Sequence, residues 1–259
     1  MSILSEIVEN KLQEIQTLKQ SFEYSGKVLK TRKPNFLTNP EFQLIAEIKP
    51  KSPSAGIIRK AFDPVSLVKE FEKKGASGIS VLTDEKYFGG SLELFKSIRE
   101  NTVLPLLRKD FILEEIQLFE SKKIGADLVL LIVKILSKEK LLQLTKLSLS
   151  LELQPVIEFN NLIELEIVTQ TLRDLNLNST SELKPILAVN NRNLETFETS
   201  IETCLHLETI IPSGFLKFAL SGIKDLDDLE KIKNSGYNGV LIGQGLVTNP
   251  ELFEEFCVK

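Results

Sequence analysis

The sequence has little of the side-chain chemistry on which many nucleophilic enzymes and metal sites depend. Its 259 residues include one histidine, His206, and two cysteines, Cys204 and Cys257, which stand far apart. Ser–His and Cys–His catalysis both need a histidine base, and zinc sites need closely spaced cysteines or histidines. His206 lies in an apparent helix far from any loop motif, so we expect a surface or packing residue. Acid–base chemistry is then left to carboxylates and lysines, with no metal site.

Long apolar runs and basic runs are also missing. The longest apolar candidate, residues 128–133, is strand-sized and far short of the roughly 18 residues of a membrane span. The net charge is −4 with no basic cluster, which argues against a nucleic-acid partner. The N-terminus mixes charges and lacks a secretory apolar core, and isolated cysteines suit a reducing compartment. We therefore expect a cytoplasmic protein that binds neither membranes nor nucleic acids.

What the sequence does contain is a regular alternation of short apolar strands and amphipathic helices. We predict strands at 44–49, 78–83, 104–109, 127–133, 155–159, 185–190, 216–221 and 239–243. Helices are predicted at 3–20, 64–74, 91–100, 114–123, 137–150, 161–175, 194–207, 225–235 and 249–257. Three helices end at Gly75, Gly125 or Gly236 just before a strand, which indicates repeated βα units with glycine caps.

Eight strands that alternate with helices predict a parallel sheet, either doubly wound or closed. The strands are short and similar, and no G-x-G-x-x-G follows the first one, so we favour a closed (β/α)8 barrel. Residues 1–259 are expected to form one domain. Residues 1–43 would be an N-terminal helical extension, its helix lying across one mouth, and residues 44–259 the barrel.

Charged side chains share a face with apolar ones at several strand ends. Residues alternate between faces, which puts Glu47 and Lys49 on the face of Ile45 and gives other strands the same pattern. The further candidates on inward faces are Lys109, Glu158, Asn190 and Arg192. A solvated strand end explains one such case, but four strands together predict charges that converge at the C-terminal mouth, where this fold holds its chemistry.

Glycines follow the last two strands, in "LSGI" (220–223) and "LIGQGL" (241–246). Amides of Gly222, Gly243 and Gln244 can bind phosphate at this end of a barrel, with Ser52 and Arg192 on further anionic groups. Apolar residues near strand ends predict an aromatic pocket that would hold an aromatic substrate. These residues are Leu82, Phe88, Phe111, Leu131 and Leu194.

The motifs "IAEIKPKSPSAG", "SVLTDEKYFGGS", "PLLRKDFI", "PVIEFNN", "VNNRNLETF" and "GVLIGQGL" resemble those of the indole-3-glycerol-phosphate synthase family of tryptophan biosynthesis, in the same order. The resemblance implies a carboxy-lyase without cofactors. It would convert an anionic small molecule, 1-(2-carboxyphenylamino)-1-deoxyribulose 5-phosphate, into indole-3-glycerol phosphate, CO₂ and water. It also implies catalytic roles for one set of residues: Glu47, Lys49, Lys109, Glu158, Asn190 and Ser221. How the two lysines divide the work stays open.

Two departures stand out. The family has glutamate before "SGI", where this chain has Leu220, and residues 173–188 replace a short turn by a polar stretch that we expect to be a loop. Leu220 keeps open the alternative of a non-catalytic barrel that binds a phosphorylated anthranilate derivative. A separate alternative is another phosphate-binding barrel enzyme such as a phosphoribosylanthranilate isomerase, which would not need this pair of lysines. We expect a monomer or weak homodimer.

Overall fold

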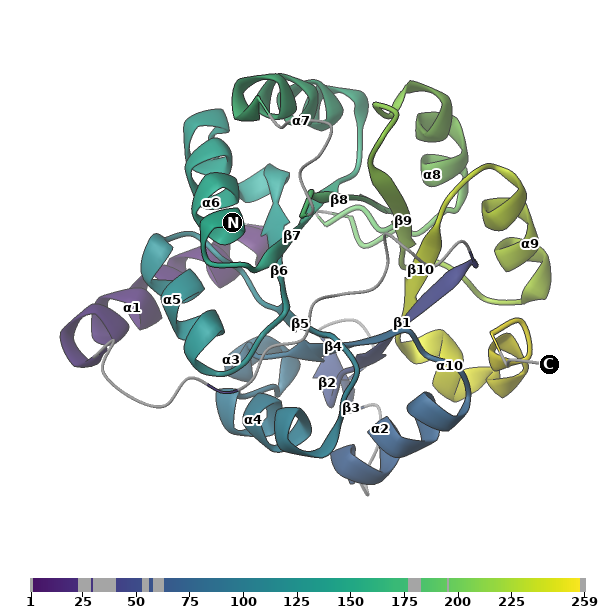
Figure 1. Cartoon of the computed structure of the whole chain (residues 1–259), viewed down its shortest axis with the longest axis horizontal. Coiled ribbons are helices and arrows are strands. Elements are labelled where there is room, and N and C mark those ends of the chain that lie inside the picture. Colours follow the sequence, from purple (N-terminus) through teal and green to yellow (C-terminus); the bar gives the residue numbers. More distant parts are fainter. Residues whose placement is uncertain are drawn as a thin grey trace.

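Eight parallel strands close into a barrel with helices around it (Figure 1). The computed structural model describes residues 2–22, 29, 41–52, 56–57, 63–176, 183–194 and 196–256, and only the backbone of Ser52, Gly56, Ile57, Gln244 and Val247. The barrel strands are β1 (Gln43–Ile48), β4 (Gly78–Leu82), β5 (Leu106–Lys109), β6 (Leu128–Ile132), β7 (Gln154–Phe159), β8 (Ile186–Asn190), β9 (Leu216–Leu220) and β10 (Gly239–Ile242). Neighbouring strands pair in chain order, and β10 pairs with β1 to close the circle. The predicted barrel and its eight strands are confirmed.

Strand alternation produces two separate apolar layers. One face of each strand packs against the outer helices, as Ala46, Val81 and Leu131 do. The opposite face fills the barrel interior with residues such as Ile45, Leu107 and Val156. Because Glu47, Lys109 and Glu158 are each two residues beyond these interior positions, their side chains continue inward toward the C-terminal mouth.

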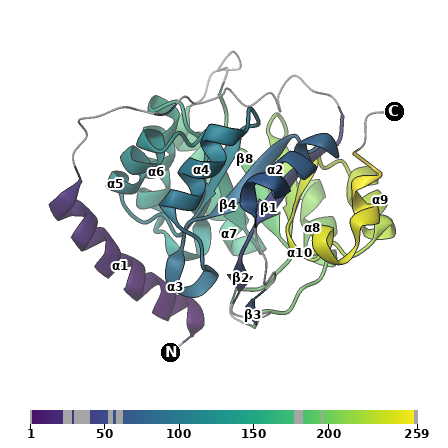
Figure 2. The same cartoon turned by 90° about the horizontal axis from the view of Figure 1, so that it is seen from below.

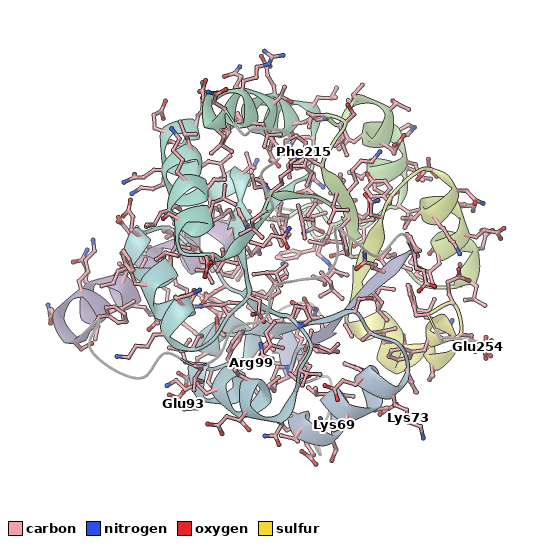
Figure 3. All side chains as sticks on the ribbon, in the orientation of Figure 1. Lys69, Lys73, Glu93, Arg99, Phe215 and Glu254 are labelled. Carbon is pink, nitrogen blue, oxygen red and sulfur yellow. The ribbon has the colours of Figure 1, made fainter. Side chains whose placement is uncertain are left out.

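The surrounding helices begin and end close to the predicted positions. They are α2 (Pro64–Lys73), α4 (Leu92–Asn101), α5 (Glu115–Lys123), α6 (Lys138–Ser150), α7 (Leu162–Leu175) and α9 (Leu226–Asn234). Gly75, Gly125 and Gly236 have φ values of 88°, 81° and 95°, so the predicted left-handed caps are confirmed. In Figure 3 charged side chains such as Lys69 and Glu93 lie at the periphery, while Arg99 lies nearer the barrel and pairs with buried Asp127.

Two helix predictions are wrong in extent. The helix expected at 194–207 is only α8 (Glu202–Leu207), followed by η3 (Glu208–Ile210). Before it, the Asn193 side chain accepts a hydrogen bond from the Thr196 amide and Arg192 bridges to Thr199, local bonds that compete with a helix. The helix expected at 249–257 is the short 3-10 helix η4 (Pro250–Phe253), because Asn249 caps a new turn at Pro250.

Several short elements at the mouth were not predicted, because two to five residues are too few to show the periodicity of a helix or a strand. These are β2 (Lys51–Ser52), β3 (Gly56–Ile57), α3 (Glu85–Phe88), η2 (Val133–Ile135) and α10 (Gln244–Thr248). Residues 177–182 of the polar stretch predicted as a loop lie outside the described residues, as does most of 21–43. The loop prediction is wrong at both ends of 173–188, where residues 173–175 belong to α7 and residues 186–188 belong to β8. No helix among the described residues is long and apolar enough to cross a membrane.

We predicted that the N-terminal helix, α1 (Ile3–Ser21), lies across one mouth of the barrel, and its observed position differs. It runs along the outside of the barrel beside α5, and its first turns reach the rim near α3 (Figure 2). Leu4 and Ile7 join the interior cluster that includes Phe111, whereas Ile15 joins the outer layer. The helix thus spans both apolar layers at one edge of the C-terminal mouth.

Candidate active site

Charged side chains from four strands meet in one cavity of about 180 Å³ at the C-terminal mouth. The Lys49 ammonium lies 2.8 Å from Glu47 Oε1, and the Lys109 ammonium lies 3.1 Å from Glu158 Oε2. The Asn190 amide donates to the other Glu158 oxygen at 2.9 Å. The structure therefore brings all five of these predicted residues together.

Burial makes these pairs interdependent. The side chains of Glu47 and Glu158 are 7% and 2% exposed, whereas those of Lys49 and Lys109 keep 21% and 16%. Burial by itself raises the pKa of Glu47, but the charges of Lys49 and Lys109 outweigh it and hold that pKa below its ordinary value. Acidic and basic side chains that are paired at the surface of a cavity can exchange protons with a bound molecule.

The predicted phosphate-binding side of the mouth lies between β9 and β10. Ser221, Gly222 and Gly243 line the cavity, and Ser221 and Gly222 have φ values of 64° and 81°. Asn191 holds this turn, because its side chain donates to the Ser221 carbonyl at 3.0 Å. A Cβ on Gly243 would lie 2.6 Å from Glu47 Oε1, so glycine is required there by the close approach of the glutamate.

Of three further predicted residues, the structure describes the side chain of only one. Arg192 lines the cavity, and its backbone amide is fixed by the Asn190 side chain at 3.0 Å. The side chains of Ser52 and Gln244 lie outside the described part of the chain. The backbone of Gln244 begins α10 directly after Gly243, which keeps its amide at the helix N-terminus.

Apolar side chains form a wall of the same cavity. Leu82, Phe88, Phe111 and Leu194 line the cavity as predicted, and the Phe88 and Phe111 rings pack 5.9 Å apart. Leu131 was assigned to this wall wrongly: it is fully buried in the outer layer, and its neighbours Leu130 and Ile132 face the cavity instead. The run "LVLLI" is apolar on both faces, so its phase could not be read from the sequence.

Several lining residues were missed. They are Asp110, Phe197, Ile223, Leu241, Ile242 and Gly245, besides Leu130 and Ile132. Phe197 lies in a segment that we predicted to be helical. Leu241 lies in a strand that is apolar on both faces, so the sequence does not show which of its residues face inward, as at Leu131. Leu220 was noted as a departure, and the structure places its buried side chain on the inner face, in register with Asn190 and Leu241.

The single histidine and Cys204 do not line this cavity, and Cys257 lies outside the described residues. The His206 side chain is 80% exposed, as expected of a surface residue, and buried Cys204 is free of any disulfide. Among the described residues no group of histidine, cysteine and acidic side chains is arranged to hold a metal ion.

Comparison with known proteins gives a consistent result. The indole-3-glycerol phosphate synthase family model matches residues 4–256. Indole-3-glycerol phosphate synthase of Chloroherpeton thalassium is 37% identical over 266 residues, covering 97% of both chains. The synthase of Lachnoclostridium phytofermentans is 41% identical over 211 residues, covering 82% of this chain and 74% of its own. The chain therefore belongs to the indole-3-glycerol phosphate synthase family.

Proposed function

We propose that this protein converts 1-(2-carboxyphenylamino)-1-deoxyribulose 5-phosphate into indole-3-glycerol phosphate, CO₂ and water, and that the paired lysines and carboxylates of the mouth carry the proton transfers. The observation that carries the proposal is the Lys109–Glu158 pair, which faces the cavity at 3.1 Å with Asn190 on the second carboxylate oxygen. The family's carboxy-lyase chemistry is the reaction that such a pair suits.

Ring closure needs an acid at the ketone oxygen while the aromatic carbon attacks the ketone carbon. The Lys109 ammonium is that acid, because it points into the cavity beside the apolar wall. The new carbon–carbon bond forms at the carbon that bears the carboxylate, and CO₂ then leaves as its bond electrons restore the ring. Since an ionised carboxylate departs as neutral CO₂, each turnover takes up one proton.

Dehydration needs an acid at the hydroxyl group and a base that removes a proton to complete the pyrrole. Glu158 serves this step, because it is within reach of Lys109 and shares the cavity. Glu47 keeps Lys49 in place at 2.8 Å, and Lys49 stabilises the substrate anions. The amides of Gly222, Gly243 and Gln244, with Ser52, Ser221 and Arg192, bind the phosphate and polar groups.

The apolar wall holds the aromatic ring. Phe88 and Phe111 pack against each other at one side of the cavity, and Leu82 and Leu194 also line it. A cavity that has both apolar side chains and a set of amides and cations fits a molecule with an aromatic ring at one end and a phosphate at the other.

One assay tests the activity. The pure protein is incubated with the carboxyphenylamino-deoxyribulose phosphate, while indole fluorescence and CO₂ release are followed. We expect both signals in equal amounts. Fluorescence without CO₂, or neither signal, contradicts the proposal, and binding without turnover identifies a non-catalytic relative. An isomerase acting on a phosphoribosyl substrate would release no CO₂.

The role of Lys109 has its own test. Lys109→Ala is expected to lower turnover by about 10²–10⁴-fold, the usual contribution of one positioned acid. Lys122→Ala is the matched control, because Lys122 has a similar exposure, 15% against 16%, and pairs with Glu152 outside the cavity. A loss of less than tenfold for Lys109→Ala would refute the assignment.

We further propose that residues 1–259 form one domain, that the protein is cytoplasmic, and that it is a monomer or weak homodimer. The free, buried thiol of Cys204 suits a reducing compartment. Among the described residues, the large exposed apolar side chains such as Val103, Ile163 and Leu226 stand mostly on separate helices or connections, and only Leu162 and Ile163 are neighbours on one helix. Sedimentation velocity at several concentrations measures the oligomeric state.

A further inference from the structure

A buried lysine of α1 connects the N-terminal helix to the rim of the barrel. The Lys11 side chain is only 4% exposed, although lysine is among the residues least often buried. Its ammonium lies 2.9 Å from Asp110 and 3.2 Å from Asp84, both of which are enclosed, and 2.6 Å from Glu14. An ammonium so enclosed needs these anions, and they need it.

Asp110 transmits this contact to the active site. It directly follows Lys109, and the oxygen that contacts Lys11 also accepts from the Phe111 amide at 2.8 Å. Its other oxygen accepts from the Thr83 hydroxyl at 2.6 Å, and the Thr83 amide donates to the Lys109 carbonyl at 3.1 Å. The backbone on both sides of Asp110 is thereby fixed, where Lys109 and Phe111 turn into the cavity.

Asp84 transmits the contact to the aromatic wall from the other side. It caps α3 by accepting from the Tyr87 amide at 2.9 Å, and α3 ends at Phe88. Phe88 packs on Phe111, which also belongs to the interior cluster with Leu4 and Ile7 of α1. Lys11 therefore lies between the two carboxylates that hold the two ring-bearing segments.

We infer that Lys11 is a positioning residue for catalysis: its ammonium sets the distance between the Asp84 and Asp110 segments, and thereby the placement of Lys109, Phe88 and Phe111. Lys11 does not line the active-site cavity, so it acts through the two aspartates. The inference rests on the proposed reaction, since it assigns Lys109 the proton transfer and the two rings the grip on the substrate.

The test compares Lys11→Met with Ile15→Ala in the full chain. Ile15 lies one helical turn further along α1, is 2% exposed and packs in the outer layer, so its truncation weakens docking of the helix without touching either aspartate. We expect Lys11→Met to lower kcat by about 10- to 100-fold, the scale of a small misplacement of reacting groups, and to raise KM. We expect Ile15→Ala to lower thermal stability but to keep both constants near those of the unaltered protein.

The change in KM separates positioning from stability. Partial unfolding only reduces the concentration of active protein, which lowers apparent kcat and leaves KM unchanged. Lys11→Arg keeps the positive charge and is expected to recover most of the lost activity. Wild-type kinetic constants for Lys11→Met, or equal losses for Ile15→Ala, would overturn the inference.

A second variant covers the case in which Lys11→Met does not fold. Asp84→Asn keeps an oxygen that can cap α3 but removes one charge facing Lys11, and we expect it to raise KM several-fold while the protein stays folded. An unchanged KM in this variant would also overturn the inference. Turnover by the unaltered protein is measured first, so a failed reaction proposal is distinguished from a failed role for Lys11.

Discussion

Strand β5 separates two groups of charges that are built from the same residue types. On the inner side, Lys109 pairs with Glu158 and borders the cavity. On the outer side, the residues before and after Lys109 in the chain, Arg108 and Asp110, pair with each other at 3.1 Å. Asp110 also pairs with Lys11, although it is one of the residues that line the cavity.

The two groups differ in how completely each ion is enclosed. Arg108 contacts Asp110, Glu120, the Gln117 carbonyl and the Ser121 hydroxyl, and its side chain is 4% exposed. Although burial opposes the charged forms, the neighbouring ions raise the pKa of Lys11 and lower that of Asp110. The outer group is thus locked in its ionised state, whereas the inner lysines keep access to a bound molecule. A charged side chain whose hydrogen-bonding and ionic partners surround it has a structural role. A charged side chain that is only partly surrounded and borders a cavity can still react with a bound molecule.

The largest effect expected from breaking this contrast is at Glu158. Glu158→Gln keeps the shape and a hydrogen-bond acceptor for Lys109 but removes the base, so turnover should fall by about 10²–10⁴-fold. Steady-state kinetics measures the loss. Glu120→Gln on the outer side is the matched change, since Glu120 pairs with Arg108, and it should leave turnover nearly unaltered. Equal effects of the two changes on turnover would remove the distinction between the groups.

The next effect is on stability and comes from the outer group. Arg108→Met leaves Asp110 and Glu120 without their shared cation in a buried site, which typically costs about 3–5 kcal/mol of unfolding free energy. Urea unfolding followed by circular dichroism measures the change. Lys49→Met, which removes the more exposed inner cation, should cost much less. A cost below about 1 kcal/mol for Arg108→Met would show that the outer group is not structural.

A smaller effect is expected from acid. The pKa of Asp110 is lower in the folded chain than its ordinary value of 3.8, so the unfolded chain binds the proton more readily. The stability that Asp110 contributes is complete above pH 3.8 and is lost as pH falls through the folded pKa. Glu47 acts in the same direction from its ordinary value of 4.5.

Unfolding free energies between pH 7 and pH 2 measure this acid effect. The loss of unfolding free energy should exceed about 1 kcal/mol. A difference of one pKa unit between the folded and the unfolded chain corresponds to about 1.4 kcal/mol. Asp110→Asn, which cannot titrate, should show a shallower loss over the same range. A variant with the same acid dependence as the unaltered protein would contradict the role given to Asp110.

The smallest expected effect concerns Leu220, where the family has glutamate. Leu220→Glu puts a further anion on the inner face beside Asn190, which itself bonds Glu158. A nearby like charge disfavours ionisation, so the acid limb of the pH profile of kcat/KM should move to higher pH, by up to about one pH unit. Leu220→Gln is the neutral control and should leave the limb in place. An unmoved limb in Leu220→Glu would mean that this position is electrically separate from the carboxylates.

The sequence by itself determined the barrel and most of the site. Strand alternation was enough to place Glu47, Lys109 and Glu158 on inward faces. In each of these strands, one of the two alternating sets of residues begins with an apolar side chain and ends with a charged one. The glycine caps at Gly75, Gly125 and Gly236 were equally local, since only a backbone with positive φ was needed. The scarcity of histidine narrowed the chemistry to lysines and carboxylates before any fold was considered.

Only the tertiary structure decided that Glu158 is the partner of Lys109 and where α1 lies. The partners Lys109 and Glu158 are 49 residues apart, and Lys11 and Asp110 are 99 apart, so no local period relates them. The sequence also could not show which residues of β6 face the cavity, because both faces of this strand are apolar. Leu130 and Ile132 face it, and Leu131 does not. The pairing of these charged side chains and their burial depend on the closure of the whole barrel, so they cannot be predicted from a local sequence pattern.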